Sequence, residues 1–292
     1  DSEEQAVEIA NDTVYGLAAD ASNADAVAHI YAAKGRPDFN PLIVHVPDLA
    51  AAEELAEFGP LARQLAEAFW PGALTLVLPL REGAKVAAAV TAGLPTIALR
   101  CPAHPVMQAV LAKSGLNLAA PSANKSGGIS PTRAEHVLAS LGGAVPMILD
   151  AGPCKEGLES TIVAIRMENI EILRPGPVTA ETLQTFSKLQ PSQQTGEKIE
   201  APGQLASHYA PTKTVRLNAQ VAEDGEWLIG FGTVAGHDNL SPTADLAQAA
   251  AHLFDALHRA DASPYRSIAV ADIPDKGIGV AINDRLKRAA TR

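Results

Sequence analysis

One loop of this sequence carries several polar groups that could hold a phosphate. Residues 121–132 contain three serines, an asparagine, a lysine and two adjacent glycines, and they follow an apolar run at 116–120. Serine hydroxyls and backbone N–H groups in such a loop can be directed at an anion, and the N-terminus of the helix that follows adds a favourable dipole. A polar turn without a ligand has the same composition, so the loop alone leaves both interpretations open. In a phosphate site, Ser122, Asn124 and Ser130 would supply the contacts.

Two cations lie close together in a second cluster. Lys34 and Arg36 flank a glycine, Asn40 follows, and prolines occupy positions 37 and 41. A lysine in the last turn of a helix often only complements the helix dipole. The prolines, however, would hold Arg36 and Asn40 rigidly, which suits a binding site. His45 lies in the strand-like run that follows, where a histidine is more often a satisfied core residue than a ligand.

Strand ends carry the remaining candidates. Thr96 and Arg100 are four positions apart, and residues separated by an even number of positions share one face of a strand. An arginine at a strand end can bind a substrate carboxylate through two parallel hydrogen bonds, although a surface salt bridge is the plain alternative. Ser160 and Thr161 begin another strand-like run, and Arg174 ends one. Each of these signals is weak by itself.

Several common classes of site are excluded by what the sequence lacks. It has no GxxxxGK[ST] loop, no GxGxxG turn, no GxSxG elbow and no HExxH motif. Its two cysteines, Cys101 and Cys154, form no CxxC pair and have no metal-binding spacing to a histidine, so no metal site is expected. The formal net charge of −10 argues against a nonspecific nucleic-acid binder. Without a signal peptide or a long apolar run, a cytoplasmic protein is expected.

The elements that position these residues alternate between strands and helices. We expect helices at 23–35 and 53–70 and after Thr132 and Thr179, and strands at 42–46, 75–78, 96–99, 147–149, 161–165 and 170–173. Residues 188–213 then change to the polar, Pro- and Gly-containing composition of a linker. A second α/β unit follows, with strands at 215–217, 227–231 and 267–270 and a helix after Ser241. We therefore predict a first domain at 1–187, a linker at 188–213 and a second domain at 214–292.

Taken together, these segments resemble one protein family. Six motifs occur in order over residues 10–186: DTVYGL at 12–17, KGRP and NPLIVH within 34–45, FWPG at 69–72, PSAN at 121–124, EST at 159–161 and RPG at 174–176. They are similar to the L-threonylcarbamoyladenylate synthase family, which has a YrdC-like fold. SHYAP at 207–211 resembles the linker of the long, two-domain form, and NLSP at 239–242 and AINDRL at 281–286 resemble its C-terminal domain. Six ordered motifs with a matching tail are far more specific than any one of them.

The resemblance implies an α/β fold: a YrdC-like twisted mixed sheet with a concave pocket, followed by a small Rossmann-like domain. The family joins L-threonine, bicarbonate and ATP into threonylcarbamoyl-AMP and releases pyrophosphate. This product serves the threonylcarbamoyladenosine modification of tRNA at position 37. Mg²⁺ would arrive with ATP, because the sequence offers no dense carboxylate cluster. Downstream partners would be the proteins that transfer threonylcarbamoyl to tRNA, and neither a membrane nor stable nucleic-acid binding is expected.

The resemblance also distributes roles among the candidate residues. The catalytic residues would be Lys34 and Arg36. The residues that would bind ATP are Arg36, Asn40, Thr96, Ser122, Asn124, Ser130 and Arg174. Those that would bind threonine are Thr13, His45, Arg100, Ser160 and Thr161. His208 and Tyr209 would form a lid over the pocket, although a linker that merely packs between domains has the same sequence.

One segment departs from the family pattern, and two other functions fit the same core. The family usually has Pro-Thr where this chain has Ala10-Asn11, so either the protein diverges here or residues are missing from the sequence. The first alternative function is an RNA-binding YrdC-like module without synthase activity. The second is the carbamoyl-transfer domain of hydrogenase maturation factors. The acidic charge and low aromatic content argue against the first, and the absence of CxxC argues against the second.

Overall fold

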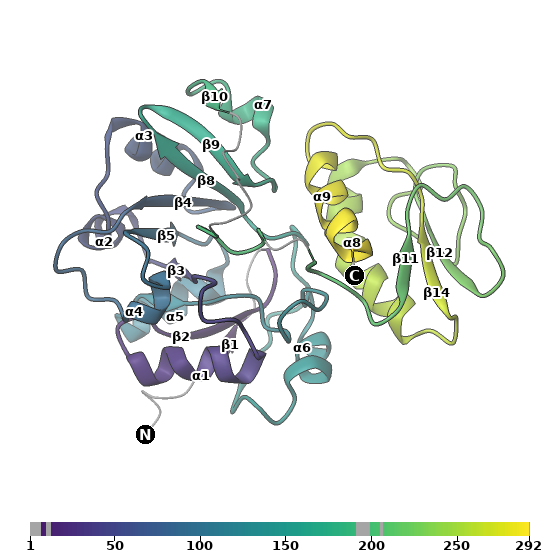
Figure 1. Cartoon of the computed structure of the whole chain (residues 1–292), viewed down its shortest axis with the longest axis horizontal. Helices are drawn as coiled ribbons and strands as arrows, with labels where there is room; N and C mark the ends of the chain where they lie inside the picture. Colours follow the sequence, from purple (N-terminus) through teal and green to yellow (C-terminus); the bar gives the residue numbers. More distant parts are fainter. Residues whose placement is uncertain (1–6, 10–12, 191–198, 205–206, 292) are drawn as a thin grey trace.

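The computed structural model describes residues 7–9, 13–190, 199–204 and 207–291, which form two domains joined by a linker (Figure 1). The strands of the first domain are β1 (Val7–Ile9), β2 (Gly16–Asp20), β3 (Ile43–His45), β4 (Leu74–Pro79), β5 (Thr96–Arg100), β6 (Leu118–Ala119), β7 (Ile148–Leu149), β8 (Thr161–Arg166), β9 (Asn169–Arg174) and β10 (Leu189–Gln190). Its helices are α1 (Ala24–Lys34), α2 (Leu49–Leu55), α3 (Pro60–Phe69), α4 (Ala88–Thr91), α5 (Pro105–Ser114), α6 (Ala134–Leu141) and α7 (Ala180–Leu183). Ala10 and Asn11 lie outside the described residues.

The described strands of the first domain form one mixed sheet in the order β10-β9-β8-β4-β5-β3-β6-β2-β1-β7. β3 and β5 are parallel, with His45 in register with Arg100, so both side chains stand at the same edge. β4 runs antiparallel to β5 and parallel to β8, which brings the first residues of β8 to this edge. β9 returns antiparallel to β8 and ends there at Arg174. Polar residues that are far apart in the sequence therefore meet at one edge, and the predicted α/β mixed sheet is confirmed.

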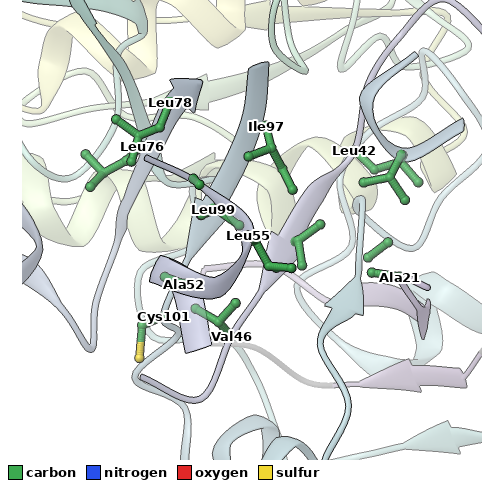
Figure 2. Close-up of a cluster of buried hydrophobic side chains, with 14 of the residues drawn as sticks. Ala21, Leu42, Val46, Ala52, Leu55, Leu76, Leu78, Ile97, Leu99 and Cys101 are labelled. Atoms are coloured by element: carbon green, nitrogen blue, oxygen red, sulfur yellow. The ribbon is translucent and has the colours of Figure 1, made fainter. Parts of the chain in front are cut away.

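An aliphatic core lies beneath this sheet. Side chains from β4 and β5, including Leu76 and Leu99, pack against α2 and the residues around β3 (Figure 2). Both leucines are fully buried. Burying a leucine stabilises a fold by about 1.5–3 kcal/mol. The core thus fixes the strands whose ends carry the polar groups.

Local signals in the sequence set the exit of α1. The Asn23 side chain accepts hydrogen bonds from the N–H groups of Asp25 and Ala26, and it thereby caps the first turn. Gly35 ends the helix in the left-handed conformation, with φ 58°. Both boundaries were expected, and they direct Arg36 out of the helix.

The structure corrects two expectations about helices and adds a helix that was not expected. The helix predicted at 53–70 is two helices, because Pro60 lacks an N–H and disfavours helical geometry at the residue before it. The capping box expected at Thr132 does not form: Arg133 is the N-cap residue, and the Thr132 N–H donates to His136 Nδ1 at 3.3 Å instead. Helix α5, which begins at a proline in the first position, was not predicted.

The second domain is a parallel sheet with two helices on one side. Its described strands are β11 (Thr214–Arg216), β12 (Glu226–Gly230), β13 (Asp238–Asn239) and β14 (Ser267–Val270), in the order β11-β14-β12-β13. The helices α8 (Leu246–Ala262) and α9 (Gly279–Ala290) lie between this sheet and the first domain (Figure 1). α9 was not expected as a helix. No helix in the described ranges is long and apolar enough to cross a membrane.

The two domains share an apolar core. Val14, Ile129 and Leu158 of the first domain belong to the same buried cluster as the apolar side chains of α8 and α9. A Cβ on Gly157 would lie 2.5 Å from the Ala251 carbonyl oxygen of α8, so only glycine permits this approach. The second domain is therefore packed against the first by close contact and not merely tethered to it.

Candidate active site

A polar cavity opens where the strand ends of the first domain meet the linker. It is lined by Thr13, Val14, Gly16, Arg36, Ile43, His45, Arg100, Ala120, Pro121, Ser122, Glu159, Ser160, Arg174, Pro202, Gly203, His208 and Tyr209. Nine of the residues proposed from the sequence are in this set: Thr13, Arg36, His45, Arg100, Ser122, Ser160, Arg174, His208 and Tyr209. The sheet and the linker thus bring together side chains that lie up to nearly 200 positions apart in the sequence, from Thr13 to Tyr209.

Three arginines face this cavity, and neutral oxygen atoms anchor each of them. Arg36 donates to the carbonyls of Asn40 (3.1 Å) and Pro41 (2.8 Å). Arg174 donates to the Ser160 carbonyl at 3.1 and 2.9 Å. Burial lowers the pKa of Arg36 to about 10, and the positive charge of Arg174 adds to this effect. Both guanidiniums remain charged at neutral pH, so the cavity is suited to an anionic ligand.

Arg100, Thr13 and His45 form one side of the cavity. Arg100 donates from Nε to the Gly72 carbonyl at 2.9 Å and from Nη1 to the Thr13 hydroxyl at 2.8 Å, which fixes the plane of its guanidinium. Burial, together with the neighbouring Arg100 charge, lowers the pKa of His45 to about 3. His45 is therefore neutral at physiological pH. A fixed guanidinium beside a hydroxyl and a neutral imidazole can hold a carboxylate and an adjacent polar group.

Ser160 connects two parts of the opposite side. Its hydroxyl lies 2.7 Å from the Thr75 hydroxyl and 3.2 Å from Arg174 Nη2. Thr161 is next in sequence but points away, because its hydroxyl donates to the Val178 carbonyl and accepts from the Val178 N–H. The alternation of a strand separates these neighbours.

Lys34 and Asn124 hold the serine-rich loop in shape. The Lys34 ammonium donates to the backbone carbonyls of Ser122 and Asn124. The Asn124 amide donates to the carbonyls of Lys125 at 2.8 Å and Gly128 at 2.9 Å. In this structure both side chains therefore bind the loop backbone, and the described loop residues in the cavity wall are Pro121 and Ser122.

Six proposed residues stand outside the lining as far as the described residues show: Lys34, Asn40, Thr96, Asn124, Ser130 and Thr161. Thr96 begins β5, whereas Arg100 ends it, so the shared face still separates them by about 13 Å. Ser130 is fully buried and donates to Glu159. Asn40 is buried, and no hydrogen-bond partner is described for its side-chain amide. The ligand roles given to these residues stay predictions.

The linker covers the cavity. His208 and Tyr209 are buried in its wall, with ring centroids 4.0 Å apart, and the Ala210 N–H donates to the Gly127 carbonyl at 2.8 Å. Burial, followed by the cations of the cavity, lowers the pKa of His208 to about 3 despite the nearby Glu159. The linker is therefore docked on the serine-rich loop. Whether it opens as a lid stays a prediction.

Glu159 and Gly203 are cavity residues to which the sequence assigned no role. Glu159 was a weak candidate within the EST motif, because a lone acidic residue gives no signal of its own. Gly203 has φ 85°, and a Cβ there would lie 2.8 Å from both Arg174 Cδ and the Tyr209 hydroxyl. The Pro202-Gly203 pair was the available signal for a tight turn.

Fold and cavity together define an α/β domain with a polar, arginine-lined cavity that the linker to a second domain covers. Residues 2–176 match the family of Sua5, YciO and YrdC, described as "Telomere recombination", and residues 178–291 match "Threonylcarbamoyl-AMP synthase, C-terminal domain". The chain belongs to the threonylcarbamoyl-AMP synthase family, in its two-domain form.

Similar proteins match over almost the whole chain. The threonylcarbamoyl-AMP synthase of Bacillus subtilis is 40% identical, over 99% of this chain and 90% of that protein. The synthase of Pyrococcus abyssi is 35% identical over 96% of this chain and 88% of its own length. A crystal structure of P. abyssi Sua5 complexed with L-threonine superimposes with a TM-score of 0.89 at 33% identity, and the match covers 99% of this chain and 91% of that one.

Proposed function

We propose that this chain synthesises threonylcarbamoyl-AMP from L-threonine, bicarbonate and ATP, with release of pyrophosphate. The full-length similarity to threonylcarbamoyl-AMP synthases supports the reaction. The observation that carries the proposal in this chain is the buried cavity with Arg36, Arg100 and Arg174 in its wall, because the carboxylate of the amino acid and the phosphates of the nucleotide are both negatively charged.

The amino acid occupies the side formed by Arg100, Thr13 and His45. Arg100 is anchored at Gly72 and Thr13, so it can present its planar group to the threonine carboxylate. His45 is neutral and adds no charge that would repel the amine. The amine then attacks the carbon of bicarbonate, water leaves, and a carbamate forms on the threonine nitrogen.

The nucleotide occupies the side formed by Arg36, Arg174 and Ser122. A carbamate oxygen attacks the α-phosphorus of ATP, and the bond from this phosphorus to the β-phosphate oxygen breaks. Negative charge accumulates on the phosphoryl oxygens during this step, and fixed guanidiniums in a buried site stabilise it. No protein nucleophile takes part, so the task of the protein is positioning and charge stabilisation.

The linker excludes water from the reaction. His208 and Tyr209 cover the cavity, and the Ala210 contact with Gly127 holds them there. A carbamate decomposes when it is protonated in water, so a covered site preserves it until it is adenylated. Substrates enter and pyrophosphate leaves when this segment lifts, which is the lid role expected of it.

Mg²⁺ enters with the triphosphate in this proposal. Within the described ranges, no group of three or more His, Cys, Asp or Glu side chains could hold a metal ion. Glu159 is the one carboxylate in the described lining, and Arg285 and Ser130 already engage its two oxygens. The cation therefore neutralises phosphate charge as part of the substrate.

The decisive experiment measures pyrophosphate release by the full chain. We expect release that requires ATP, bicarbonate and L-threonine together, and an adenylate product whose mass equals threonylcarbamoyl-AMP. Serine and valine serve as matched amino-acid controls. Equal release without an amino acid would reject the synthase proposal, and tight tRNA binding without any release would favour the RNA-binding module. The product then supplies the enzymes that modify tRNA.

A further inference from the structure

An arginine of the second domain reaches the wall of the cavity. Arg285 projects from α9 and its side chain is fully buried. Its Nε donates to Glu159 Oε2 at 2.9 Å, and its Nη1 donates to Asp284 Oδ2 at 2.7 Å. The guanidinium carbon also lies 5.1 Å from the centre of the Tyr209 ring, within cation–π range. This one side chain thus contacts the first domain, the linker and its own helix.

Glu159 is a carboxylate that, without a partner of its own, would compete with an anionic substrate for the arginines of the cavity. It faces the cavity among the described lining residues, together with Arg36, Arg100 and Arg174. Its Oε1 accepts from the Ser130 hydroxyl, while Oε2 is taken by Arg285. Burial alone would raise the pKa of Glu159, but the charges of Arg285 and then Arg174 outweigh it and hold the pKa below its ordinary range. Glu159 is therefore an anion inside a site for anions.

A buried anion pairs with the nearest available cation. In a medium of low dielectric constant, an ionised carboxylate without a partner is costly, so it moves towards a cation or takes up a proton. The charge of Arg174 already acts on Glu159, and the Ser160 contacts of Arg174 leave it facing the cavity. Without Arg285, Glu159 would turn to Arg174 and neutralise a cation that the nucleotide needs.

Resting on the proposed function, we propose that Arg285 is a positioning residue of the synthase: it pairs Glu159 from outside the cavity and so keeps Arg174 available to the phosphates of ATP. The second domain then has a specific part in the reaction in addition to its packing. Consecutive salt bridges link Arg288 to Asp284, Asp284 to Arg285, and Arg285 to Glu159. Two cations and two anions are thus paired with one another and not with the substrate.

The test compares a variant that lacks the Arg285 cation with a variant that lacks both this cation and the Glu159 anion. Arg285→Met should raise the KM for ATP by about tenfold to a hundredfold, the range that a displaced binding group costs. The double variant Arg285→Met with Glu159→Gln leaves no competing anion, so its KM for ATP should return most of the way to the wild-type value. L-threonine binding without ATP, measured by calorimetry, should be similar in all of these proteins, because Arg100 and Thr13 lie on the other side.

Arg133→Met is the matched control. Arg133 also crosses the interface, with Nε 3.0 Å from Asp255 Oδ1, but it does not contact Glu159. An equal loss in Arg133→Met, or a double variant that binds ATP no better than Arg285→Met, would overturn the proposal and leave only interface stability. If Arg285→Met does not fold in thermal melts, Arg285→Gln with and without Glu159→Gln gives the same comparison. Wild-type protein without threonine-dependent pyrophosphate release would reject the synthase proposal itself, which is a separate outcome.

Discussion

At the scale of single residues, the candidate site depends on how its arginines are anchored. Backbone carbonyls and hydroxyls hold Arg36, Arg100 and Arg174 in place. Neutral acceptors fix the direction of a guanidinium without neutralising it. A cation that is both rigid and charged loses little freedom when an anion arrives, which favours tight and selective binding.

Arg100→Lys tests this point for the amino acid. Lysine keeps the charge but cannot reach Gly72, Thr13 and a carboxylate at once, because it lacks the planar fork. We expect the KM for L-threonine to rise by about tenfold or more, while the KM for ATP changes by less than about twofold. Steady-state pyrophosphate release with each substrate varied gives both values. Arg81→Lys, on the exposed surface, is the control. An unchanged threonine KM would remove Arg100 from the site.

At the scale of elements, short segments with special backbone geometry complete the cavity. α1 ends at Gly35 and releases Arg36, and the linker turns at Gly203 and brings Tyr209 against Arg174. Both turns use the left-handed backbone that glycine adopts without a steric penalty. The elements themselves are ordinary, and the turns between them place the side chains.

Gly203→Ala should lower synthesis far more than stability. Its Cβ would collide with Arg174 and the Tyr209 hydroxyl, so the linker could not close over the cavity. Gly83→Ala is a matched control, because Gly83 has a similar φ of 76° and nothing within 4 Å of an added Cβ. Each substitution should cost about 1–2 kcal/mol of stability from the left-handed backbone alone. Thermal melts beside pyrophosphate assays separate the two effects, and equal activity in the two variants would contradict the closure role.

At the scale of the whole molecule, the interface between the domains carries a pair of stacked histidines. The rings of His136 in α6 and His258 in α8 lie 3.8 Å apart at 18°. The Thr132 N–H donates to His136 Nδ1, and the ring of His258 contacts the Ser130 carbonyl at 3.1 Å. Burial, then the neighbouring His258, lowers the pKa of His136 to about 4 although Asp255 opposes this. Burial also lowers the pKa of His258.

Acid should therefore loosen the interface. An unfolded histidine titrates near pH 6.5, so between about pH 6.5 and 4 the unfolded chain binds protons that the folded chain excludes. Stability is fully present above this window and falls as the pH drops through it. We expect the melting temperature to fall from pH 7 to 5, and to fall less in the double variant His136→Gln with His258→Gln. The pKa values of His45 and His208 are also lowered, so these two histidines make the protein less stable in acid as well. Part of the pH dependence therefore remains in the double variant. The exposed His29→Gln is the control, and identical profiles for all three proteins would contradict a role of the pair.

Truncation after residue 190 tests how far the first domain depends on the second. The sequence alone predicts a folded fragment, because all the core motifs lie upstream. The structure shows that Val14, Ile129 and Leu158 pack into the apolar cluster of the second domain. We now expect the fragment to lose synthesis and also to melt well below the full chain, since each exposed large apolar side chain costs about 1.5–3 kcal/mol. Circular dichroism melts with a pyrophosphate assay measure both, and a fragment as stable and active as the full chain would contradict this expectation.

Features that depend on neighbouring residues could be predicted from the amino-acid sequence. Asn23 and Gly35 mark the ends of α1, and the serine-rich loop, the Lys34–Arg36 cluster and the strand-end arginines are visible as composition and spacing. Ordered motifs then indicated the family and the reaction. Capping, turn conformation and strand alternation are local, which is why short stretches of sequence predict them.

Which polar groups face the cavity and which hold the protein together depends on contacts between residues that are distant in the sequence. Lys34 binds the carbonyls of a loop 88 residues away, and Glu159 meets Arg285 across 126 residues and a domain interface. Such pairings follow from strand register and from the packing of α8 and α9 on the first domain, which involve residues distant in sequence. Spacing along one strand put Thr96 and Arg100 on a shared face, but it could not tell that the cavity stands at one end of that strand.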